Sequence, residues 1–255
     1  MICNVVKAGG AVLEDKGLRN RFLEGFAALG GRKVLVHGGG RSATTVAAAL
    51  GIPTTMIEGR RVTDEGMREV VTMVYGGLVN KEIVAALQVL GIDALGLTGA
   101  DLSLVVSRKR PPVEIEGKTV DFGYVGDVVS VNAEALGKLL EWGKVPVVAP
   151  LSFDPDWGLM NTNADTMASE VAAALAADNE VSLTFCFEKE GVLGVDGRVI
   201  PEIDPALYGK LKSDGTVSGG MIPKIENAFA ALSRGVKAVR ITDIGHLDGG
   251  TLIYG

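Results

Sequence analysis

Apolar and polar positions alternate along this chain in two distinct patterns. Short runs that are almost wholly apolar are typical of strands buried on both faces of a sheet. Longer segments with apolar residues three or four positions apart are typical of helices that cover such a sheet. The patterns predict strands over residues 2–6, 33–37, 94–97, 104–107, 145–149, 181–187 and 238–242, and helices over residues 18–29, 42–50, 64–90, 133–142, 164–177 and 225–233.

This alternation predicts an α/β fold with an open, mostly parallel sheet sandwiched between layers of helices. Residues 113–131 carry short segments around three glycines, which indicates β-hairpins outside the main sheet. We expect helix 64–90 to break near Gly76-Gly77, and we place a boundary between two lobes, residues 1–178 and 179–255, after the alanine-rich helix. The long helix has an apolar stripe that would belong to the core or to a subunit interface, formed by Met67, Val70, Val71, Val74 and Leu78.

Composition and charge argue against several classes of protein. The chain has 255 residues, of which 47% are hydrophobic and 22% charged, as is ordinary for a globular protein. Its net charge is −6 and its longest basic run is Arg108-Lys109-Arg110, which argues against a nucleic-acid partner. Cys3 and Cys186 are too few for a metal site of their own or for a disulfide framework, and they fit a reducing cytosol. The sequence shows no signal-peptide pattern and no apolar stretch of about 18 residues that would span a membrane.

Two lysines lie in glycine-rich segments near opposite ends of the chain. Lys7 follows an apolar run and precedes Gly9-Gly10, and Lys224 follows Ser218-Gly219-Gly220. Glycine lets backbone N–H groups approach an anion closely, and lysine adds a mobile positive charge. Phosphoryl transfer depends on that combination, because its catalysis is mostly positioning and charge neutralisation. Since the sequence lacks the P-loop signature G-x-x-x-x-G-K-[ST], we expect an enzyme that handles a triphosphate in another way.

A third glycine segment, Gly38-Gly39-Gly40, follows a strand that ends in His37 and opens a helix. Ligands of open parallel sheets bind beyond the carboxyl ends of the strands, so this loop and the one after Lys7 should share one rim, where helix N–H groups also attract anions. Tight strand-to-helix turns are an alternative for each loop. A dinucleotide-binding site is a second alternative, because residues 38–43 fit G-x-G-x-x-A and Glu58 could be the acidic residue that follows this fingerprint. The fingerprint, however, normally occupies the first βα turn of the fold. We expect His37 to be a structural, hydrogen-bonded residue.

Polar residues near two further helix entries are candidates for substrate contacts. The planar fork of Arg61 suits a carboxylate, although a surface ion pair with Asp64 or Glu65 is an equal alternative. The segment Asn161-Thr162-Asn163-Ala164-Asp165 precedes another helix. Asn163 or Thr162 would suffice as a helix cap, with Asp165 complementing the helix dipole. Two asparagines and an aspartate exceed what capping needs, so the segment is also a candidate for orienting an amide substrate and nearby lysines.

Five motifs taken together resemble the N-acetylglutamate kinases of the amino-acid kinase superfamily. They occur in the order of that family, at compatible spacing, over residues 5–224. The motifs are Val6-Lys7-Ala8-Gly9-Gly10, Val36-His37-Gly38-Gly39-Gly40, Arg61-Val62-Thr63, Asn161-Thr162-Asn163-Ala164-Asp165 and Gly219-Gly220-Met221-Ile222-Pro223-Lys224. Residues 36–43, 73–81 and 186–193 further resemble a branch found in Bacteroidetes-type bacteria, part of which uses N-succinylglutamate.

The resemblance implies ATP-dependent phosphorylation, with Mg²⁺ carried by the nucleotide, of the side-chain carboxylate of N-acetyl-L-glutamate or N-succinyl-L-glutamate in arginine biosynthesis. The first lobe would bind the acylated glutamate and form a homodimer, and the second would bind ATP. The catalytic residues would be Lys7 and Lys224, which stabilise the transferring group, and Asp165, which organises both lysines. The substrate would contact Gly39, Gly40, Arg61, Asn161 and Asn163. The nucleotide would contact Gly9, Gly10, Gly191, Gly219, Gly220 and Met221.

The chemistry of this reaction agrees with the residues present. A glutamate side chain has a reference pKa of about 4.3, so the attacking carboxylate is already ionised at neutral pH and needs no general base. The difficulty lies in bringing it against a polyphosphate, which cations and N–H dipoles relieve. A succinyl group would add a second carboxylate, for which Arg60, Arg41 and Arg108 are candidate partners.

The chain also departs from the family. Ala8 replaces a residue that is often larger, and Glu188-Lys189-Glu190-Gly191 replaces the commoner Thr/Ser-Asp-Val-x-Gly, which leaves the adenine contacts open.

Alternatives are a kinase of the glutamate 5-kinase or carbamate kinase type, and a non-catalytic nucleotide or amino-acid sensor, which should have lost one of the two lysines or Asp165. We expect a cytoplasmic homodimer that acts on small molecules and has no nucleic-acid or membrane partner. Because the first strand begins near residue 2, we expect neither the N-terminal helix of arginine-sensitive members nor inhibition by arginine.

Overall fold

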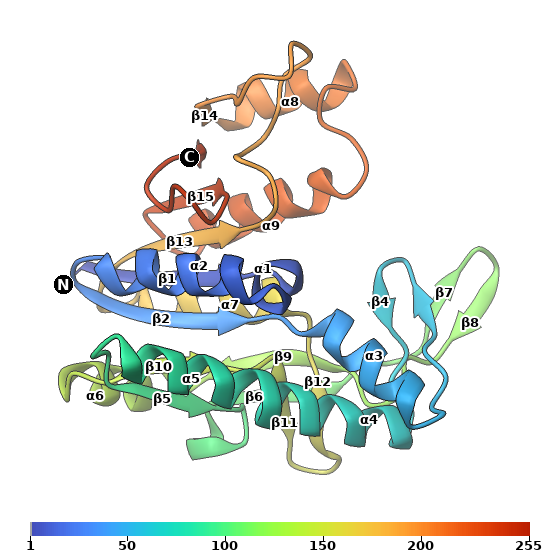
Figure 1. Ribbon diagram of the computed structural model, residues 1–255. Helices are drawn as coiled ribbons and strands as arrows, with labels where there is room; N and C mark the ends of the chain where they lie inside the picture. The colour runs from blue at the N-terminus through green and yellow to red at the C-terminus, as the bar shows by residue number, and fades with distance from the viewer. Residues whose placement is uncertain (1) are drawn as a thin grey trace.

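A computed structural model describes residues 2–255, with every side chain in that range except those of Ala11 and Pro223. The strands of its main sheet are β1 (Ile2–Ala8), β2 (Arg32–His37), β5 (Ala94–Leu97), β10 (Val145–Val148), β13 (Glu180–Cys186), β14 (Glu202–Ile203), β15 (Ala238–Thr242) and β16 (Thr251–Ile253). They are ordered β14-β16-β15-β13-β1-β2-β10-β5 (Figure 1). All neighbours pair in parallel except β15 and β16, so the predicted open, mostly parallel sheet is confirmed.

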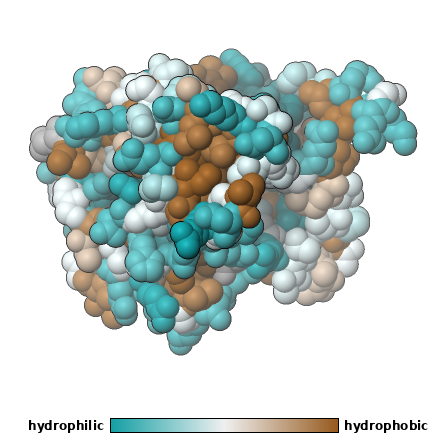
Figure 2. Space-filling model, turned by 90° about the horizontal axis from the view of Figure 1, so that it is seen from above, coloured by the Kyte–Doolittle hydropathy of each residue, from teal (hydrophilic) through white to brown (hydrophobic). Residues whose placement is uncertain are grey.

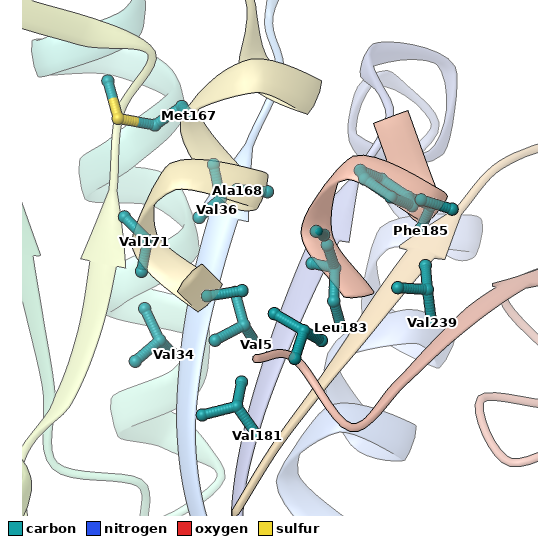
Figure 3. Close-up of a cluster of buried hydrophobic side chains, with 14 of the residues drawn as sticks. Val5, Val34, Val36, Met167, Ala168, Val171, Val181, Leu183, Phe185 and Val239 are labelled. Atoms are coloured by element: carbon teal, nitrogen blue, oxygen red, sulfur yellow. The ribbon is translucent and has the colours of Figure 1, made fainter. Parts of the chain in front are cut away.

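Helices cover both faces of this sheet. They are α1 (Gly10–Glu14), α2 (Lys16–Ala28), α3 (Gly40–Ala49), α4 (Glu65–Val71), α5 (Asn80–Val89), α6 (Ala133–Glu141), α7 (Ala164–Leu175), α8 (Pro205–Ser213) and α9 (Met221–Ser233), with a 3₁₀ turn η2 (Asp101–Ser103). Successive strand residues point to opposite faces. Val5 and Val34 therefore pack against α7, as Figure 3 shows, whereas Val6 and Leu35 belong to the core under α2 and α5. This two-sided burial explains why the strands are almost wholly apolar.

A second, four-stranded sheet lies beside the main one. Its order is β12-β11-β6-β9, from strands β6 (Val105–Lys109), β9 (Gly126–Val131), β11 (Leu151–Asp154) and β12 (Gly158–Asn161). Two hairpins, β3 (Met56–Ile57) with β4 (Arg60–Arg61) and β7 (Val113–Ile115) with β8 (Lys118–Val120), stand apart from it, and β7–β8 protrudes at the right of Figure 1. The prediction of hairpins outside the main sheet is confirmed. The hairpin β11–β12 was missed, because its first strand follows β10 with almost no break in the apolar run.

Residues 65–89 form one continuous helix, so the predicted break at Gly76-Gly77 is wrong. Between α4 and α5 the chain winds as a π-helix, η1 (Thr72–Val79). A Cβ on Gly76 would lie 3.4 Å from side-chain carbons of Leu151 and Thr98, so this glycine permits close packing of the helix on its neighbours and does not end it.

The long helix also has the length and hydropathy of a membrane span, contrary to the expectation from sequence. Its interior position argues for a core helix instead. Of the predicted apolar stripe, Met67, Val70, Val71 and Val74 are buried in the core, whereas Leu78 is 51% exposed.

The C-terminal part of the chain contributes four strands at one side of the sheet, with α8 and α9 (Figure 1). Figure 2 looks onto this part from above and shows hydrophobic residues gathered near its centre among hydrophilic ones. The sequence pattern missed α8, although Asp204 caps it and Pro205 occupies its first turn, two signals that were visible in the sequence. The main sheet runs through both parts, with β13 paired to β1, and the lobe boundary after Asp178 stays a prediction.

Candidate active site

Lys7 and two glycine loops lie at one rim of the main sheet. In the parallel pair of β1 and β2, Lys7 lies beside Val36 and Ala8 beside His37, so both strands end together. The Gly38 N–H donates a hydrogen bond to the Ala8 carbonyl at 2.9 Å. A Cβ on Gly38 would lie only 3.1 Å from the Gly10 nitrogen, so the loops approach more closely than a side chain comfortably allows. The predicted shared rim is confirmed.

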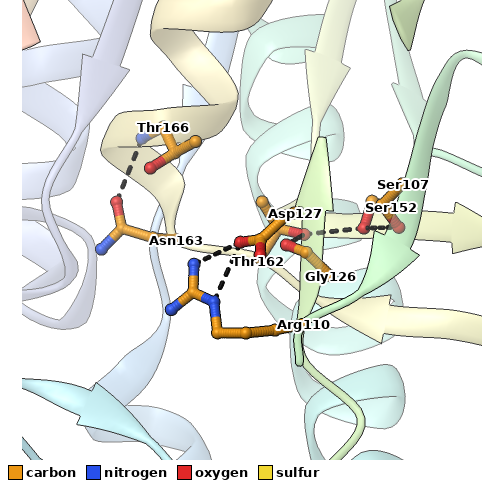
Figure 4. Close-up of polar contacts among 8 residues, drawn as sticks. All are labelled: Ser107, Arg110, Gly126, Asp127, Ser152, Thr162, Asn163 and Thr166. Atoms are coloured by element: carbon orange, nitrogen blue, oxygen red, sulfur yellow. Dashed lines mark hydrogen bonds and ion pairs between the residues drawn. The ribbon is translucent and has the colours of Figure 1, made fainter. Parts of the chain in front are cut away.

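Helix α7 brings a carboxylate to the same rim. The Asn163 side-chain oxygen caps this helix by accepting hydrogen bonds from the N–H groups of Asp165 and Thr166, at 2.8 and 3.0 Å. Figure 4 shows the bond from Thr166. In the first turn, Asp165 Oδ1 lies 2.7 Å from the Lys7 Nζ. Because Lys7 is 7% exposed, this ion pair is shielded from water, and its members interact more strongly than a surface pair.

Lys224, from α9, completes the cluster together with an aromatic ring. Its Nζ lies 3.2 Å from the centre of the Phe187 ring, and the Lys7 Nζ lies 4.7 Å from the same centre. Burial lowers the pKa of Lys224, an effect that Asp165 opposes. An aromatic face attracts cations, so Phe187 helps to hold both ammonium groups in one place. This role of Phe187 was not predicted from the sequence, because an aromatic residue after a buried strand looks like the end of that strand.

A pocket of about 660 Å³ opens beside the cluster. Both lysines and Asp165 line it, as do Glu188 and Lys189, where the adenine contacts were left open. Five of the six residues predicted to contact a nucleotide also line it, namely Gly9, Gly10, Gly191, Gly220 and Met221. Gly219 does not; it adopts a φ of +53° in the turn that leads into α9.

A second pocket, of about 210 Å³, is lined by all the residues predicted to contact a substrate, namely Gly39, Gly40, Arg61, Asn161 and Asn163. Gly40 lines both pockets, so the two spaces meet at the glycine loop. The Asn161 amide is fixed by donating to the Thr63 hydroxyl at 2.9 Å.

Arg61 is an interior residue and not part of a surface ion pair. Its Nη2 donates to the Gly40 carbonyl at 2.7 Å and to the Thr44 hydroxyl at 2.8 Å. Asp64 instead caps α4 by accepting from the Met67 N–H. The alternative of a pair with Asp64 or Glu65 is therefore wrong, and the guanidinium is locked beside the glycine loop.

The smaller pocket also holds charged residues that were not predicted from the sequence. Arg110 donates from Nε to Asp127 at 2.9 Å and makes a second contact through Nη2, as Figure 4 shows. Arg60 lines the same pocket; partial burial lowers its pKa, and the positive charge of Arg110 lowers it further. Of the other two arginines proposed for a second carboxylate, Arg41 lines the nucleotide-side pocket and Arg108 pairs with Asp156 at 3.2 Å.

A chain of hydroxyl groups ties the second sheet to the entry of α7. The Ser152 hydroxyl lies 2.7 Å from those of Ser107 and Thr162, and the Thr162 hydroxyl donates to the Gly126 carbonyl at 3.3 Å (Figure 4). Thr162 also lines the smaller pocket, so this buried network supports the pocket wall.

The geometry also bears on the alternative of a dinucleotide site and on the two cysteines. Glu58 lies in the turn between β3 and β4 and not at the end of a strand in the main sheet, which does not suit the acidic residue of a dinucleotide site. Cys3 and Cys186 are buried free thiols. Over residues 2–255, no three His, Cys, Asp or Glu side chains gather closely enough to hold a metal ion.

Comparison with known proteins identifies the family of the chain. The model of the amino acid kinase family matches residues 3–243. An acetylglutamate kinase from Parabacteroides distasonis is 53% identical, over 98% of each chain. One from Bacteroides fragilis is 52% identical over 98% of this chain and 95% of that protein, and one from Methanopyrus kandleri is 42% identical over 98% and 99%.

Solved structures agree with this match. A protein from Streptococcus mutans superposes with a TM-score of 0.80 at 29% identity, over 99% of this chain and 98% of that one. A carbamate kinase from Giardia lamblia bound to AMP-PNP, 14% identical with a TM-score of 0.69 over 99% and 98%, shares the fold. The family model and the near full-length relatives together show that this chain belongs to the amino acid kinase family.

Proposed function

We propose that this chain is an N-acetylglutamate kinase, which transfers the γ-phosphoryl group of ATP to the side-chain carboxylate of N-acetyl-L-glutamate in arginine biosynthesis. The observation that carries the proposal is the cluster of Lys7, Asp165 and Lys224 beside two pockets that meet at Gly40. Relatives that carry this name at 52–53% identity over nearly the whole chain support it.

In this reaction a carboxylate oxygen attacks the γ-phosphorus, and the bond from that phosphorus to the bridging oxygen of ADP breaks. The products are an acyl phosphate and ADP, and no proton has to move. The 660 Å³ pocket is suited to ATP because it combines glycine backbone with two lysines. Mg²⁺ would arrive with the nucleotide and neutralise part of its charge. The smaller pocket, with Arg61 and two asparagines, is suited to an acylated amino acid.

We assign the chemistry to three residues. Lys7 and Lys224 would neutralise the charge that the carboxylate and the phosphoryl group bring together, and Asp165 would hold Lys7 in place through its ion pair. The N–H groups of Gly39 and Gly40 would add fixed dipoles from the loop between the pockets. Arg61 would act largely through its bond to the Gly40 carbonyl, since its guanidinium is already committed there.

The lining of the pockets supports a proposal that the two parts of the chain bind different substrates. All residues that line the smaller pocket lie between positions 38 and 166, whereas residues 187–241 line only the larger one. We therefore propose that residues 1–178 bind the acylated glutamate and residues 179–255 supply most of the ATP site. ATP as a substrate and buried free thiols suit a cytoplasmic protein that acts on small molecules.

An N-succinyl group is a second candidate for the acyl part of the substrate. Arg60 and Arg110 both line the small pocket, and Asp127 neutralises only one of the two charges. A second carboxylate would find a partner in the other. The ratio of kcat/KM for the N-succinyl and N-acetyl substrates decides between the two acyl groups. A tenfold preference for the N-acetyl substrate would exclude the N-succinyl hypothesis.

The function is tested by ATP consumption with N-acetylglutamate, N-succinylglutamate, free glutamate and carbamate. We expect turnover with at least one acylated glutamate and little with the other two substrates. The protonated α-amino group of free glutamate would bring a positive charge next to Arg60 and Arg110, and carbamate is too small to reach Arg61 and the asparagines together. Equal turnover of free glutamate would contradict the proposal. Hydroxylamine, which traps acyl phosphates, would confirm that the acceptor is a carboxylate.

A further inference from the structure

His37 is fully buried at the end of β2 and does not touch the lysine cluster. Its Nδ1 lies 2.7 Å from the Gly38 carbonyl oxygen, and its Nε2 lies 3.1 Å from Nδ2 of Asn80. A carbonyl oxygen can only accept a hydrogen bond, and an amide nitrogen can only donate one. The ring is therefore neutral and carries its proton on Nδ1. Burial, which lowers the pKa of His37 to about 4, favours the same neutral state.

Two further hydrogen bonds fix the orientation of the Asn80 side-chain amide. Its Nδ2 also donates to the Val147 carbonyl at 2.9 Å, and its Oδ1 accepts from Lys81 Nζ at 3.1 Å. Lys81 donates in turn to the Gly96 carbonyl at 3.2 Å. With both ends of the amide occupied, only Nδ2 can face His37. A line of contacts thus runs from β5 through the start of α5 to the end of β2.

The π-helix explains how Asn80 reaches this position. A π-helix closes its hydrogen bonds over five residues, so it turns each residue through a smaller angle than an α-helix and changes the face on which later residues lie. The segment η1 ends at Val79, directly before Asn80. It also packs Tyr75 and Val79 on the glycine loop, since a Cβ on Gly39 would lie 2.8 Å from a ring carbon of Tyr75. Such segments are rare and are frequent at functional sites.

The contact to Gly38 controls a group in the active site. The Gly38 carbonyl and the Gly39 N–H belong to one planar trans peptide unit and point in opposite directions. Holding the oxygen against His37 therefore turns the N–H away from the ring. A Cβ on Gly10 would lie 3.8 Å from the nitrogens of both Gly39 and Gly40, so both nitrogens lie beside the other glycine loop. Within the described chain, neither N–H has a hydrogen-bond acceptor.

We propose that His37 is a positioning residue for phosphoryl transfer: with Asn80, it fixes the Gly38 peptide so that the N–H groups of Gly39 and Gly40 face the transferring group. This inference rests on the proposed function. It predicts that one particular nitrogen of the ring matters for turnover, whereas a purely structural histidine would matter only for stability.

Two substitutions separate the nitrogens of the ring. In His37→Asn, the side-chain amide occupies the place of Nδ1 and still donates to Gly38. In His37→Gln, it occupies the place of Nε2 and keeps only the contact with Asn80. We expect His37→Asn to retain most of kcat and His37→Gln to lose about 10- to 100-fold, with a smaller change in the KM for ATP, because misplaced donors weaken the transition state more than the ground state.

A matched control lies on the same strand. Lys33 is buried and donates to the Ala27 and Leu29 carbonyls at the end of α2. Lys33→Met should lower the Tm without lowering kcat. A third variant, Asn80→Leu, removes the donor that keeps the ring proton on Nδ1. It should lower kcat in the same direction as His37→Gln, whereas the amide of His37→Asn has no tautomer to control and does not need Asn80.

Nitrogen NMR of histidine-labelled protein provides a readout that is independent of activity. The chain has two histidines, and the exposed His246 serves as the reference. We expect His37 to show a neutral ring with the proton on Nδ1 at pH 7. A ring protonated on Nε2, or equal kcat for the Asn and Gln variants, would overturn the inference. If the wild type turned over no acylated glutamate, the proposed function would be wrong as well. If the wild type were active and the Asn and Gln variants had equal kcat, only the inference about His37 would be wrong.

Discussion

Two lysines, an aspartate and an aromatic ring form the centre of the proposed active site. Lys7 is tied to Asp165 at 2.7 Å, whereas Lys224 is closest to the face of Phe187. Like charges on the two lysines oppose their close approach, and the carboxylate and the ring relieve that repulsion. The arrangement keeps two positive charges where a carboxylate and a phosphate would have to meet.

Loss of either lysine should therefore affect turnover more than folding. Removing one preorganised donor at a site of developing charge costs roughly 10²–10³ in kcat, so we expect losses in or beyond that range for Lys7→Ala and Lys224→Ala. Thermal unfolding should show that both variants remain folded. Lys212→Ala, which removes an exposed lysine paired with Glu226 on the far side of α9, is the control and should keep its activity. A Lys224→Ala enzyme with near-normal kcat would contradict the role given to that lysine.

The buried His37 also makes stability depend on pH. Its pKa is about 4 in the folded protein and about 6.5 when unfolded, so between these values the unfolded chain binds the extra proton. Stability contributed by the neutral ring is complete above pH 6.5 and is lost as the pH falls toward 4, by roughly 3 kcal/mol in total. Urea unfolding at several pH values measures this loss. His37→Gln should flatten the slope between pH 6.5 and 4, and an unchanged slope would refute the assignment.

Individual site residues were predictable from sequence only where their type carries a signal. Lys7, Gly39 and Asp165 belong to glycine, lysine and capping patterns that have a physical meaning before the fold is known. Phe187 and Tyr75 have no such pattern, because an aromatic residue in an apolar segment looks like core. Arg110 and Asp127 come together only through the pairing of β6 with β9, which brings Arg108 opposite Asp127.

At the scale of elements, the register between strands and the winding of one helix decide where the site residues lie. The buried strands and most helices were predictable, because burial on two faces leaves a plain apolar run. The π-helix was not, since η1 packs against Gly39 and Leu151, which are distant in sequence, and local composition does not reveal these contacts. Gly76-Gly77 looked like a helix break, and only the nearness of Leu151 shows why the helix continues there.

The contact between α5 and β5 offers a test at this scale. A Cβ on Gly96 would lie 1.9 Å from the Asn80 Oδ1 and 2.6 Å from the Lys81 Nζ, so Gly96→Ala must displace both side chains. We expect a loss of about 1–3 kcal/mol in stability, typical of overpacking, together with a fall in kcat like that of His37→Gln. Gly77→Ala, whose Cβ would meet open space, is the matched control. A Gly96→Ala enzyme with normal kcat would show that Asn80 can move without consequence.

At the scale of the whole molecule, the fold class was predictable because alternating buried strands and amphipathic helices have few arrangements. The second sheet was only partly predictable. Its strands are short and pair across long stretches of sequence, as β6 does with both β9 and β11, so no local pattern reveals it. The main sheet runs through both parts of the chain, with β13 paired to β1, which explains why no linker in the sequence separates them.

The structure narrows the surface through which two copies of the chain would form a homodimer. Most of the apolar stripe on the long helix is buried in the protein's own core, so it cannot supply the interface of the expected homodimer. The same helix nevertheless exposes Met73 (52%) and Leu78 (51%), and Met73 lines a groove with Leu159. A two-fold interface is self-complementary, so one substitution acts twice within it. We expect light scattering to give the mass of two chains for the wild type and of one chain for Met73→Glu. Val195→Glu, at an exposed valine of the C-terminal part, should leave the mass unchanged. A monomeric wild type would refute the dimer, and a dimeric Met73→Glu would place its interface elsewhere on the molecule.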